Sequence, residues 1–425
     1  MVRSEVRCDD LAALVGTFFT RLRAPGNAAA RAMPSPIVIR HAPRGFWGVK
    51  NHPLSGITLA AWARLLWRHR FDVDWLRYWP RLAFLTLMSC FNLVGAACDW
   101  LLYSRAIARQ ELNPEPVFIL GHPRTGTTHL HNLLSKDPRF AHCTTFTVGF
   151  PSGFLSFRFL APLLGLIMDS KRPMDDMALA WDTPQEDEVA VNQLSAGASP
   201  YMPLCFPRRE RDFRRFYDFR DASPAEFARW RDAFVHFLKK TQYAAGGAGK
   251  RLLLKSPVHT ARVRTLRAMF PRAQFIFAHR HPLETFQSAE HMAHAYYHQC
   301  HLQTPSAEDT QEFILRQGEV LHAAYRGDIG AVDAKDKTQV RFEDLNADPL
   351  GVLRRVYGEL GWSGGEARGG GSGAAFFEGT MRPTLEAYRD SLRHFRMNAH
   401  APLSAEAERV VRERWGAWFE DLGYE

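Results

Sequence analysis

A glycine loop carrying hydroxyl and guanidinium side chains is the stretch whose residue types point most directly to chemistry. Residues 121–128, GHPRTGTT, keep the glycine spacing of the phosphate-binding signature G-x-x-x-x-G-K-[ST]. Thr127 replaces the lysine of that signature, Thr128 follows it, and Arg124 lies inside the loop. Such a turn at the start of a helix offers backbone N–H groups and the positive end of the helix dipole to an anion. We therefore predict a site for a tetrahedral oxyanion.

Two features distinguish this loop from a site for a nucleoside triphosphate: the lysine is missing, and no predicted strand ends in a convincing acidic residue. The lysine of the signature reaches the terminal phosphates, and an acidic side chain would hold the magnesium ion. The loop therefore favours a less charged, phosphate-like donor, and a P-loop nucleotide kinase is only a minor alternative.

The elements that must position this loop alternate between strands and helices. Strands are predicted at residues 117–120, 251–255, 274–280 and 338–345. Helical patterns follow at residues 127–134, at 263–269, from 283 and after 348. This alternation predicts an α/β, P-loop-like fold, in which a central parallel sheet is flanked by helices and preceded by an N-terminal helical hydrophobic region. In such a sheet the ligand lies at the carboxyl ends of the strands.

The charge balance of the 425-residue chain is basic, with 54 Lys and Arg residues against 45 Asp and Glu residues. A basic excess favours nucleic acid, an anionic membrane surface or a small polyanionic ligand as partner. The sequence has no recognised nucleic-acid-binding motif and no long basic tract, which argues against nucleic acid. The chain is long enough for a large packed core.

Together, several motifs resemble those of the sulfotransferases that use 3'-phosphoadenosine 5'-phosphosulfate (PAPS). Residues 123–128 match the family's P-R-[ST]-G-T-[ST] loop, which cradles the 5'-phosphosulfate, and Arg280 with Ser288 matches its site for the 3'-phosphate. The resemblance runs from about Pro116 to Trp362 and is closest to a broad bacterial and algal branch, through DTPQEDE, LLKSPVHT and FPRAQFIFAHRHP. It implies PAPS as co-substrate and no required metal. The donor-binding residues that it implies are Arg124, Thr125, Gly126, Thr127, Thr128, Arg280 and Ser288.

The resemblance also implies a catalytic lysine, Lys255, at the end of a strand. Many relatives place a lysine here to contact the transferring sulfuryl group or the bridging oxygen. A histidine base commonly stands two residues later in the small-molecule branch, but this chain has Pro257 there. His259, two residues further on, is a candidate base or simply the start of a helix.

A carboxylate in the segment WDTPQEDEVA, residues 181–190, is the preferred general base. Asp182 or Thr183 is expected to cap a helix that begins near Pro184, which would place the acids in its first turn. Other sulfotransferase branches use a glutamate as base, so the resemblance makes Glu186 the first choice and Glu188 the second. Acids in a first turn are also favoured by the helix dipole, so a purely structural role is the alternative.

The acceptor is expected to be a small molecule or a lipid with a free hydroxyl. The apolar run at residues 153–168 and the hydrophobic N-terminal region favour a lipid-like alcohol: a sterol, a hydroxylated fatty chain or a glycolipid. A carbohydrate hydroxyl is the second possibility and an amine the third. The histidines of residues 291–301 have spacings that zinc ligands can have, but a polar helix face or an acceptor-pocket wall is preferred. A membrane-tethered protein without catalysis is a further alternative, and the oligomeric state is not indicated.

The chain divides into a leader or disordered segment at 1–36, a helical membrane-seeking region at 37–112 and the catalytic domain at 113–425. Residues 82–103 are long enough to cross a bilayer. Because the basic excess precedes them, a spanning helix would place the catalytic domain across the membrane, which in a eukaryote predicts a Golgi membrane. Asp99 is costly at membrane depth. A buried helix and a helix lying in the membrane interface are therefore the alternatives.

Overall fold

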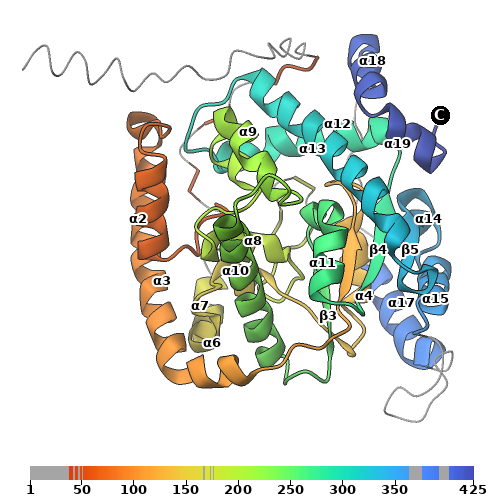
Figure 1. The fold of residues 1–425 in the computed structure, drawn as a ribbon, viewed down its shortest axis with the longest axis horizontal. Coiled ribbons are helices and arrows are strands. Elements are labelled where there is room, and N and C mark those ends of the chain that lie inside the picture. Colours follow the sequence, from red (N-terminus) through yellow and green to blue (C-terminus); the bar gives the residue numbers. More distant parts are fainter. Residues whose placement is uncertain are drawn as a thin grey trace, which may run out of the picture. The chain divides into compact units, whose positions relative to one another are not determined.

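The computed structural model describes residues 38–41, 44–45, 48–49, 51–165, 168–172, 174–175, 177–362, 376–391 and 402–425, so the expected leader at 1–36 lies outside the description. The chain from Ile37 to Glu425 groups into one compact unit (Figure 1). Its strands are β1 (Val117–Leu120), β2 (Phe140–Ala141), β3 (Arg251–Lys255), β4 (Gln274–His279) and β5 (Lys337–Arg341). Its α-helices are α2 (Leu59–Arg68), α3 (Trp75–Arg109), α4 (Thr127–Leu134), α5 (Thr145–Gly149), α6 (Phe154–Phe157), α7 (Ala161–Gly165), α8 (Asp187–Leu194), α9 (Glu210–Phe213), α10 (Pro224–Ala244), α11 (Val263–Met269), α12 (Pro282–Tyr296), α13 (Ala307–Asp328), α14 (Phe342–Ala347), α15 (Pro349–Glu359), α17 (Arg382–Ser391), α18 (Ala405–Arg414) and α19 (Gly416–Leu422).

The predicted parallel sheet flanked by helices is confirmed. Its five strands have the order β2-β3-β1-β4-β5, and each neighbouring pair is parallel. Two predicted boundaries were wrong. The last strand ends at Arg341, because Phe342 begins α14. Helix α8 begins at Asp187, three residues after Pro184, and its N-cap is Glu186 rather than Asp182 or Thr183. The two-residue strand β2 was not predicted, because so short an edge strand has no periodicity of its own.

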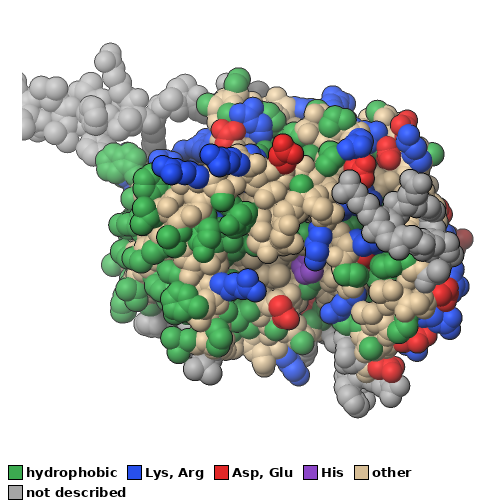
Figure 2. All heavy atoms as spheres, turned by 90° about the horizontal axis from the view of Figure 1, so that it is seen from below, with side chains coloured by type: hydrophobic (Ala, Val, Ile, Leu, Met, Phe, Trp, Pro, Cys, Tyr) green, Lys and Arg blue, Asp and Glu red, His purple; other side chains and the backbone are tan. Residues whose placement is uncertain are grey.

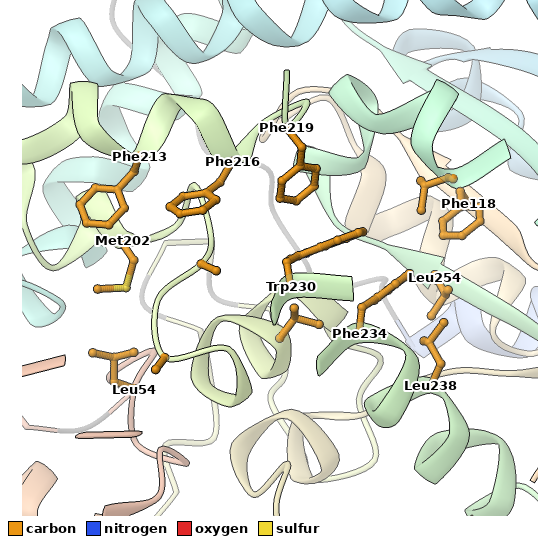
Figure 3. Packing of buried hydrophobic residues seen from close by; sticks show 14 of the residues in the cluster. Leu54, Phe118, Met202, Phe213, Phe216, Phe219, Trp230, Phe234, Leu238 and Leu254 are labelled. Atoms are coloured by element: carbon orange, nitrogen blue, oxygen red, sulfur yellow. The ribbon is translucent and has the colours of Figure 1, made fainter. Parts of the chain in front are cut away.

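Both faces of the sheet are buried, which explains why its strands are continuous apolar runs rather than alternating ones. On one face, Phe118 of β1 and Leu254 of β3 pack in a cluster with Trp230 and Phe234 of α10 (Figure 3). On the other face, Val117 and neighbouring strand residues pack with side chains of α4, α15 and α17. Since the strands are held from both sides, their carboxyl ends are rigid positions for functional side chains.

The strand order creates a switch point beside the central strand β1. The chain turns to β2 and β3 on one side of β1 and to β4 and β5 on the other. The glycine loop follows β1, Lys255 ends β3, and Arg280 follows β4. The three predicted motifs, far apart in sequence, therefore meet at the edge where open α/β sheets bind their ligands.

The long helix α3 turns one face toward the rest of the unit, and Arg81, Asn92 and Asp99 are buried on that face. By length and composition it is the one helix among the described residues that could cross a membrane. It lies beside α10 and α6 (Figure 1). Along its inner face Asp99 is buried and forms an ion pair of 2.8 Å with Lys240 of α10. Asp99 also accepts hydrogen bonds from the backbone N–H groups of Leu155 and Ser156, so this costly carboxylate is satisfied by protein groups.

The Asp99–Lys240 pair supplies a test of how α3 is held. Asp99→Ala leaves the Lys240 ammonium buried without its counter-charge, and we expect the free energy of unfolding in urea to fall by about 3–5 kcal/mol. Asp232→Ala is the control, because Asp232 and its partner Arg231 are exposed, and it should change stability by no more than about 0.5 kcal/mol. Equal effects of the two substitutions would contradict a buried contact between α3 and α10.

Candidate active site

The glycine loop is held in a shape that only glycine permits at two positions. Gly121 has φ +142° and Gly126 has φ +84°, and a Cβ on Gly126 would lie 2.3 Å from the ring of Phe342. Thr260 closes the loop from the other side, since its hydroxyl accepts from the Gly121 N–H at 2.7 Å. The Thr125 hydroxyl donates to the carbonyl of His122 at 2.8 Å, so this predicted donor-binding side chain braces the turn itself.

The loop opens onto the N-terminus of α4, with Gly126 as the N-cap. The first N–H groups of a helix have no intrahelical acceptor, and here they belong to Thr127 and its neighbours. Thr127 is buried and Thr128 is half-buried. The backbone N–H groups, the helix dipole and the Thr128 hydroxyl thus form a cradle suited to an anion.

Three side chains from three elements meet beside this cradle. The Lys255 ammonium lies 3.3 Å from the Thr128 hydroxyl and 2.7 Å from a carboxylate oxygen of Glu186. The other oxygen of Glu186 accepts from the Tyr201 hydroxyl at 2.5 Å. Burial, reinforced by the charge of Glu186, raises the pKa of Tyr201 well above its usual range, so its phenol stays protonated and donates. Lys255 is buried, whereas Glu186 is 24% exposed.

The two acids that follow Glu186 fasten α8 to the segment after β3, the 3-10 turn Pro257–Arg262. Asp187 accepts from the Ser256 hydroxyl at 3.1 Å and pairs with His259 at 2.6 Å. Glu188 forms a bidentate pair with Arg262, at 2.7 and 3.1 Å. Although burial alone would raise it, the charge and hydrogen bond of His259 hold the pKa of Asp187 below its usual range.

These contacts separate the three base candidates. Glu188 and His259 are fully buried, and each is engaged by a charged partner within the protein. Their positions leave no access for an acceptor hydroxyl. Glu186 is partly exposed and lies beside the anion cradle.

The side chains predicted for the 3'-phosphate lie on the β4 side of the loop. The Ser288 hydroxyl, on α12, accepts from the Arg124 guanidinium at 3.0 Å, so the two predicted anchors are joined directly. Arg124 also pairs with Asp175 at 3.0 Å. Arg280 pairs with Glu284 at 2.9 Å, and its guanidinium lies over the Phe342 ring at 4.7 Å.

Several residues that shape the site carry no signal that sequence reasoning could use. Tyr201 and Asp175 reach Glu186 and Arg124 from loops without a motif. Phe342 contacts both Gly126 and Arg280, yet in sequence it is one aromatic residue among many. Of these residues, Ser256 could most easily have been predicted from the sequence, because it directly follows Lys255.

The described residues contain no group of three or more His, Cys, Asp and Glu side chains arranged to hold a metal ion. In the histidine-rich segment, His294 stacks on His41 and His301 bonds to the Leu204 carbonyl. These histidines have individual structural contacts.

Comparisons with known proteins agree with this architecture. A model described as "Sulfotransferase family" matches residues 116–364. Omega-hydroxy-beta-dihydromenaquinone-9 sulfotransferase Stf3 of Mycobacterium bovis and that of Mycobacterium tuberculosis are each 30% identical over 370 residues, covering 87% of this chain and 90% of the relative. 

Two solved structures share the fold. Sulfotransferase STF1 from Mycobacterium tuberculosis H37Rv has a TM-score of 0.58 at 17% identity, over 84% of this chain and 91% of its own. Sulfotransferase STF9 from Mycobacterium avium has a TM-score of 0.55 at 15% identity, over 100% and 99%. With the family model matched from before β1 to beyond α15, and relatives matched over most of both lengths, this chain belongs to the sulfotransferase family and is an enzyme.

Proposed function

We propose that the protein transfers a sulfuryl group from PAPS to the hydroxyl of a lipid-like alcohol. One observation carries the proposal: Thr128, Lys255 and Glu186 form a continuous row of contacts from the anion cradle to a partly exposed carboxylate. An anion site, a cation and a base side by side are the three groups that such a transfer needs.

The row suggests a role for each side chain. The acceptor oxygen attacks sulfur and forms a new S–O bond, while the bond between sulfur and the bridging oxygen of PAPS breaks. The acceptor proton passes to the Glu186 carboxylate, and the leaving group is adenosine 3',5'-bisphosphate. Lys255 stabilises the negative charge that develops at the bridging oxygen, and the loop N–H groups hold the adjacent 5'-phosphate.

The two ends of the site suit the two anionic ends of PAPS. The cradle at Gly126–Thr128 would take the 5'-phosphosulfate, and Arg280 with Ser288 would take the 3'-phosphate. Arg124, hydrogen-bonded to Ser288, lies between these anchors and is proposed to serve the donor's phosphates. The transfer as proposed uses no metal ion, because cationic side chains and backbone dipoles supply the charge stabilisation.

A hydroxyl on an apolar chain is the acceptor that we propose. The name of the relative Stf3 describes an omega-hydroxylated menaquinone derivative. In this chain, an apolar cluster that includes Phe146, Phe150 and Phe157 extends from α3 to Trp181, five residues before Glu186. These apolar surroundings, together with the name of the relative, support a hydroxylated isoprenoid or fatty chain ahead of the sterol and glycolipid alternatives.

We also propose that the enzyme works at a membrane, where such an acceptor dissolves. The apolar helix α3 supports association. The relatives are mycobacterial, which gives the Golgi location no support. The contacts of Asp99 with Lys240 disfavour a spanning helix, and with it the topology that places the catalytic domain across the membrane.

Glu186→Gln tests the base. It keeps the shape of the side chain and removes the proton acceptor, so we expect kcat to fall by about 10²–10⁴. Binding of adenosine 3',5'-bisphosphate, measured by calorimetry, should stay close to that of the unmodified enzyme.

Glu188→Gln is the matched control, because it makes the same change two residues away. It leaves Arg262 buried without a counter-charge, and we expect the unfolding free energy to fall by about 3–5 kcal/mol. The loss for Glu186→Gln should be smaller, because Glu186 is 24% exposed and its pair with Lys255 is partly screened by water, whereas Glu188 and Arg262 are fully buried. An active Glu186→Gln enzyme beside a stable, inactive Glu188→Gln enzyme would reject the assignment.

Arg280→Ala tests the 3'-phosphate anchor. Losing a charged hydrogen bond costs about 1.5–3 kcal/mol, so we expect PAPS affinity to fall roughly ten- to hundredfold. The affinity of adenosine 5'-phosphosulfate, which lacks the 3'-phosphate, should hardly change. Arg355→Ala is the control, because Arg355 pairs with Glu359, four residues later, just as Arg280 pairs with Glu284. Equal losses for both donors would refute the anchor.

A further inference from the structure

The inner face of α3 is bound to the protein along most of its length. Arg81 donates to the carbonyls of Gly48, His298 and His301. Asn92 donates to the carbonyls of Ser55 and Ile57, at 2.7 and 3.2 Å. Together with the Asp99–Lys240 pair, these contacts would be lost if α3 left the unit to cross a bilayer. The helix would then carry an unpaired arginine and an unpaired aspartate into hydrocarbon, which is costly.

Large hydrophobic side chains are exposed on the outer face of α3 and on the segments next to it. Leu76 is 96% exposed, Leu101 74% and Trp100 71%. Figure 2 shows hydrophobic side chains gathered on the left, the side that α2 and α3 form in Figure 1. A soluble monomer rarely leaves so extensive an apolar patch uncovered. We call this patch the α3 face; its exposed large hydrophobic residues are Trp67, Phe71, Trp75, Leu76, Trp79, Leu87, Leu93, Val94, Trp100, Leu101, Leu102, Phe159 and Leu163.

Positive charge accompanies the α3 face. The segment from Leu59 to Arg109 contains seven arginines, three aspartates, and no lysine or glutamate. One of the arginines, Arg81, and one of the aspartates, Asp99, are buried. The exposed arginines lie toward the two ends of the face: Arg64, Arg68, Arg70, Arg77, Arg105 and Arg109.

A cavity opens within this apolar region, between α3 and α10. Its volume is about 810 Å³, and its lining includes Leu93 and Trp100 of the α3 face. Small residues such as Ala96 and Ala97 line the α3 side. The charged lining residues are Arg231, Lys239, Lys240, Asp99 and Asp232, with Arg231 paired to Asp232 and Lys240 to Asp99. Three cations against two acids leave a net positive charge beside the apolar wall, which suits an anionic amphiphile.

We propose that the α3 face is a docking surface for an anionic phospholipid bilayer, on which the enzyme lies without spanning it. The leucines and phenylalanines enter the boundary between headgroups and acyl chains, and the tryptophans lie at the level of the headgroups. The arginines bind lipid phosphates while their aliphatic stems cover apolar surface. The recess between α3 and α10 takes an acyl chain, with the lipid phosphate at Lys239, whose ammonium donates to the Ala108 carbonyl and pairs with no carboxylate of the described residues.

The arginines favour a membrane over a second copy of the chain. A two-fold dimer through the α3 face would place the same patch on both sides and bring arginines of like charge together. An anionic bilayer provides the opposite charge over the whole surface. The docking goes beyond the proposed reaction, and it serves that reaction by keeping the site next to a lipid-dissolved acceptor.

Vesicle flotation of the full chain tests the proposal without any catalysis. The probes are vesicles of phosphatidylcholine alone or mixed with phosphatidylglycerol. We expect the enzyme to float with the mixed vesicles, less with phosphatidylcholine, and less again as salt increases. Arg64→Gln/Arg68→Gln/Arg70→Gln should lower the affinity for mixed vesicles by about 100-fold, at roughly fivefold for each arginine.

Leu76→Glu/Leu101→Glu should abolish flotation on both kinds of vesicle. Both positions are exposed, so the variant should fold and should keep its turnover with a short-chain soluble alcohol. Ala323→Glu adds one negative charge at an exposed position of α13 and should float like the unmodified enzyme, whereas Leu101→Glu, which also adds one, should not. Glu186→Gln should also float normally, so a failure of the proposed chemistry and a failure of docking give different results.

Three outcomes would overturn the docking surface. The first is no flotation of the folded enzyme with mixed vesicles, or an equal loss for Ala323→Glu. The second is enzyme that stays in isolated cell membranes when they are washed with high salt and excess mixed vesicles. If only detergent then releases the enzyme, α3 spans the membrane. The third is a lipid-free dimer that Leu101→Glu dissociates, which would assign the face to a second copy of the chain.

Discussion

The pairing of two short charged segments at the end of β3 is the interaction on which the site depends. Glu186, Asp187 and Glu188 follow one another in sequence, yet each reaches a different partner: Lys255, Ser256 with His259, and Arg262. Two of the three acids are fully buried. Removing such charges from water is costly, and the cost is offset only when every one meets its counterpart with good geometry. The two segments can therefore pair in only one alignment, in which each acid meets its own partner.

That alignment decides what each acid can do. Asp187 and Glu188 are turned inward and hold the N-terminus of α8 on the strand end. Glu186, as the N-cap, lies at the boundary of the buried network and keeps some exposure beside Lys255. Lys255 in turn contacts Thr128 of the glycine loop. A structural ion-pair network on one side and an anion cradle on the other thus leave Glu186 as the partly exposed carboxylate of the three.

The same constraint governs the membrane-seeking helix. Arg81, Asn92 and Asp99 must be paired, and their partners lie in the rest of the unit. Their pairing determines which face of α3 turns inward, and it leaves the tryptophans and leucines outside. Because residues three and four apart share a face of a helix, fixing the inner face of α3 also fixes which side chains lie on its outer face.

Much of this protein was determined by its sequence alone. The apolar runs predict the strands β1, β3 and β4 to within one residue, because strands buried on both faces need continuous apolar side chains. The loop GHPRTGTT predicts an anion site, because glycine spacing and helix position are local properties. The family followed from the order of local motifs. The tertiary structure alone decided which of Glu186, Glu188 and His259 stays partly exposed and that Arg124 reaches Ser288. It also decided that Arg81 and Asp99 of α3 turn inward while the other arginines of that helix stay exposed. These outcomes depend on partners far away in the chain, and burial and charge pairing become defined only when the sheet brings those partners together.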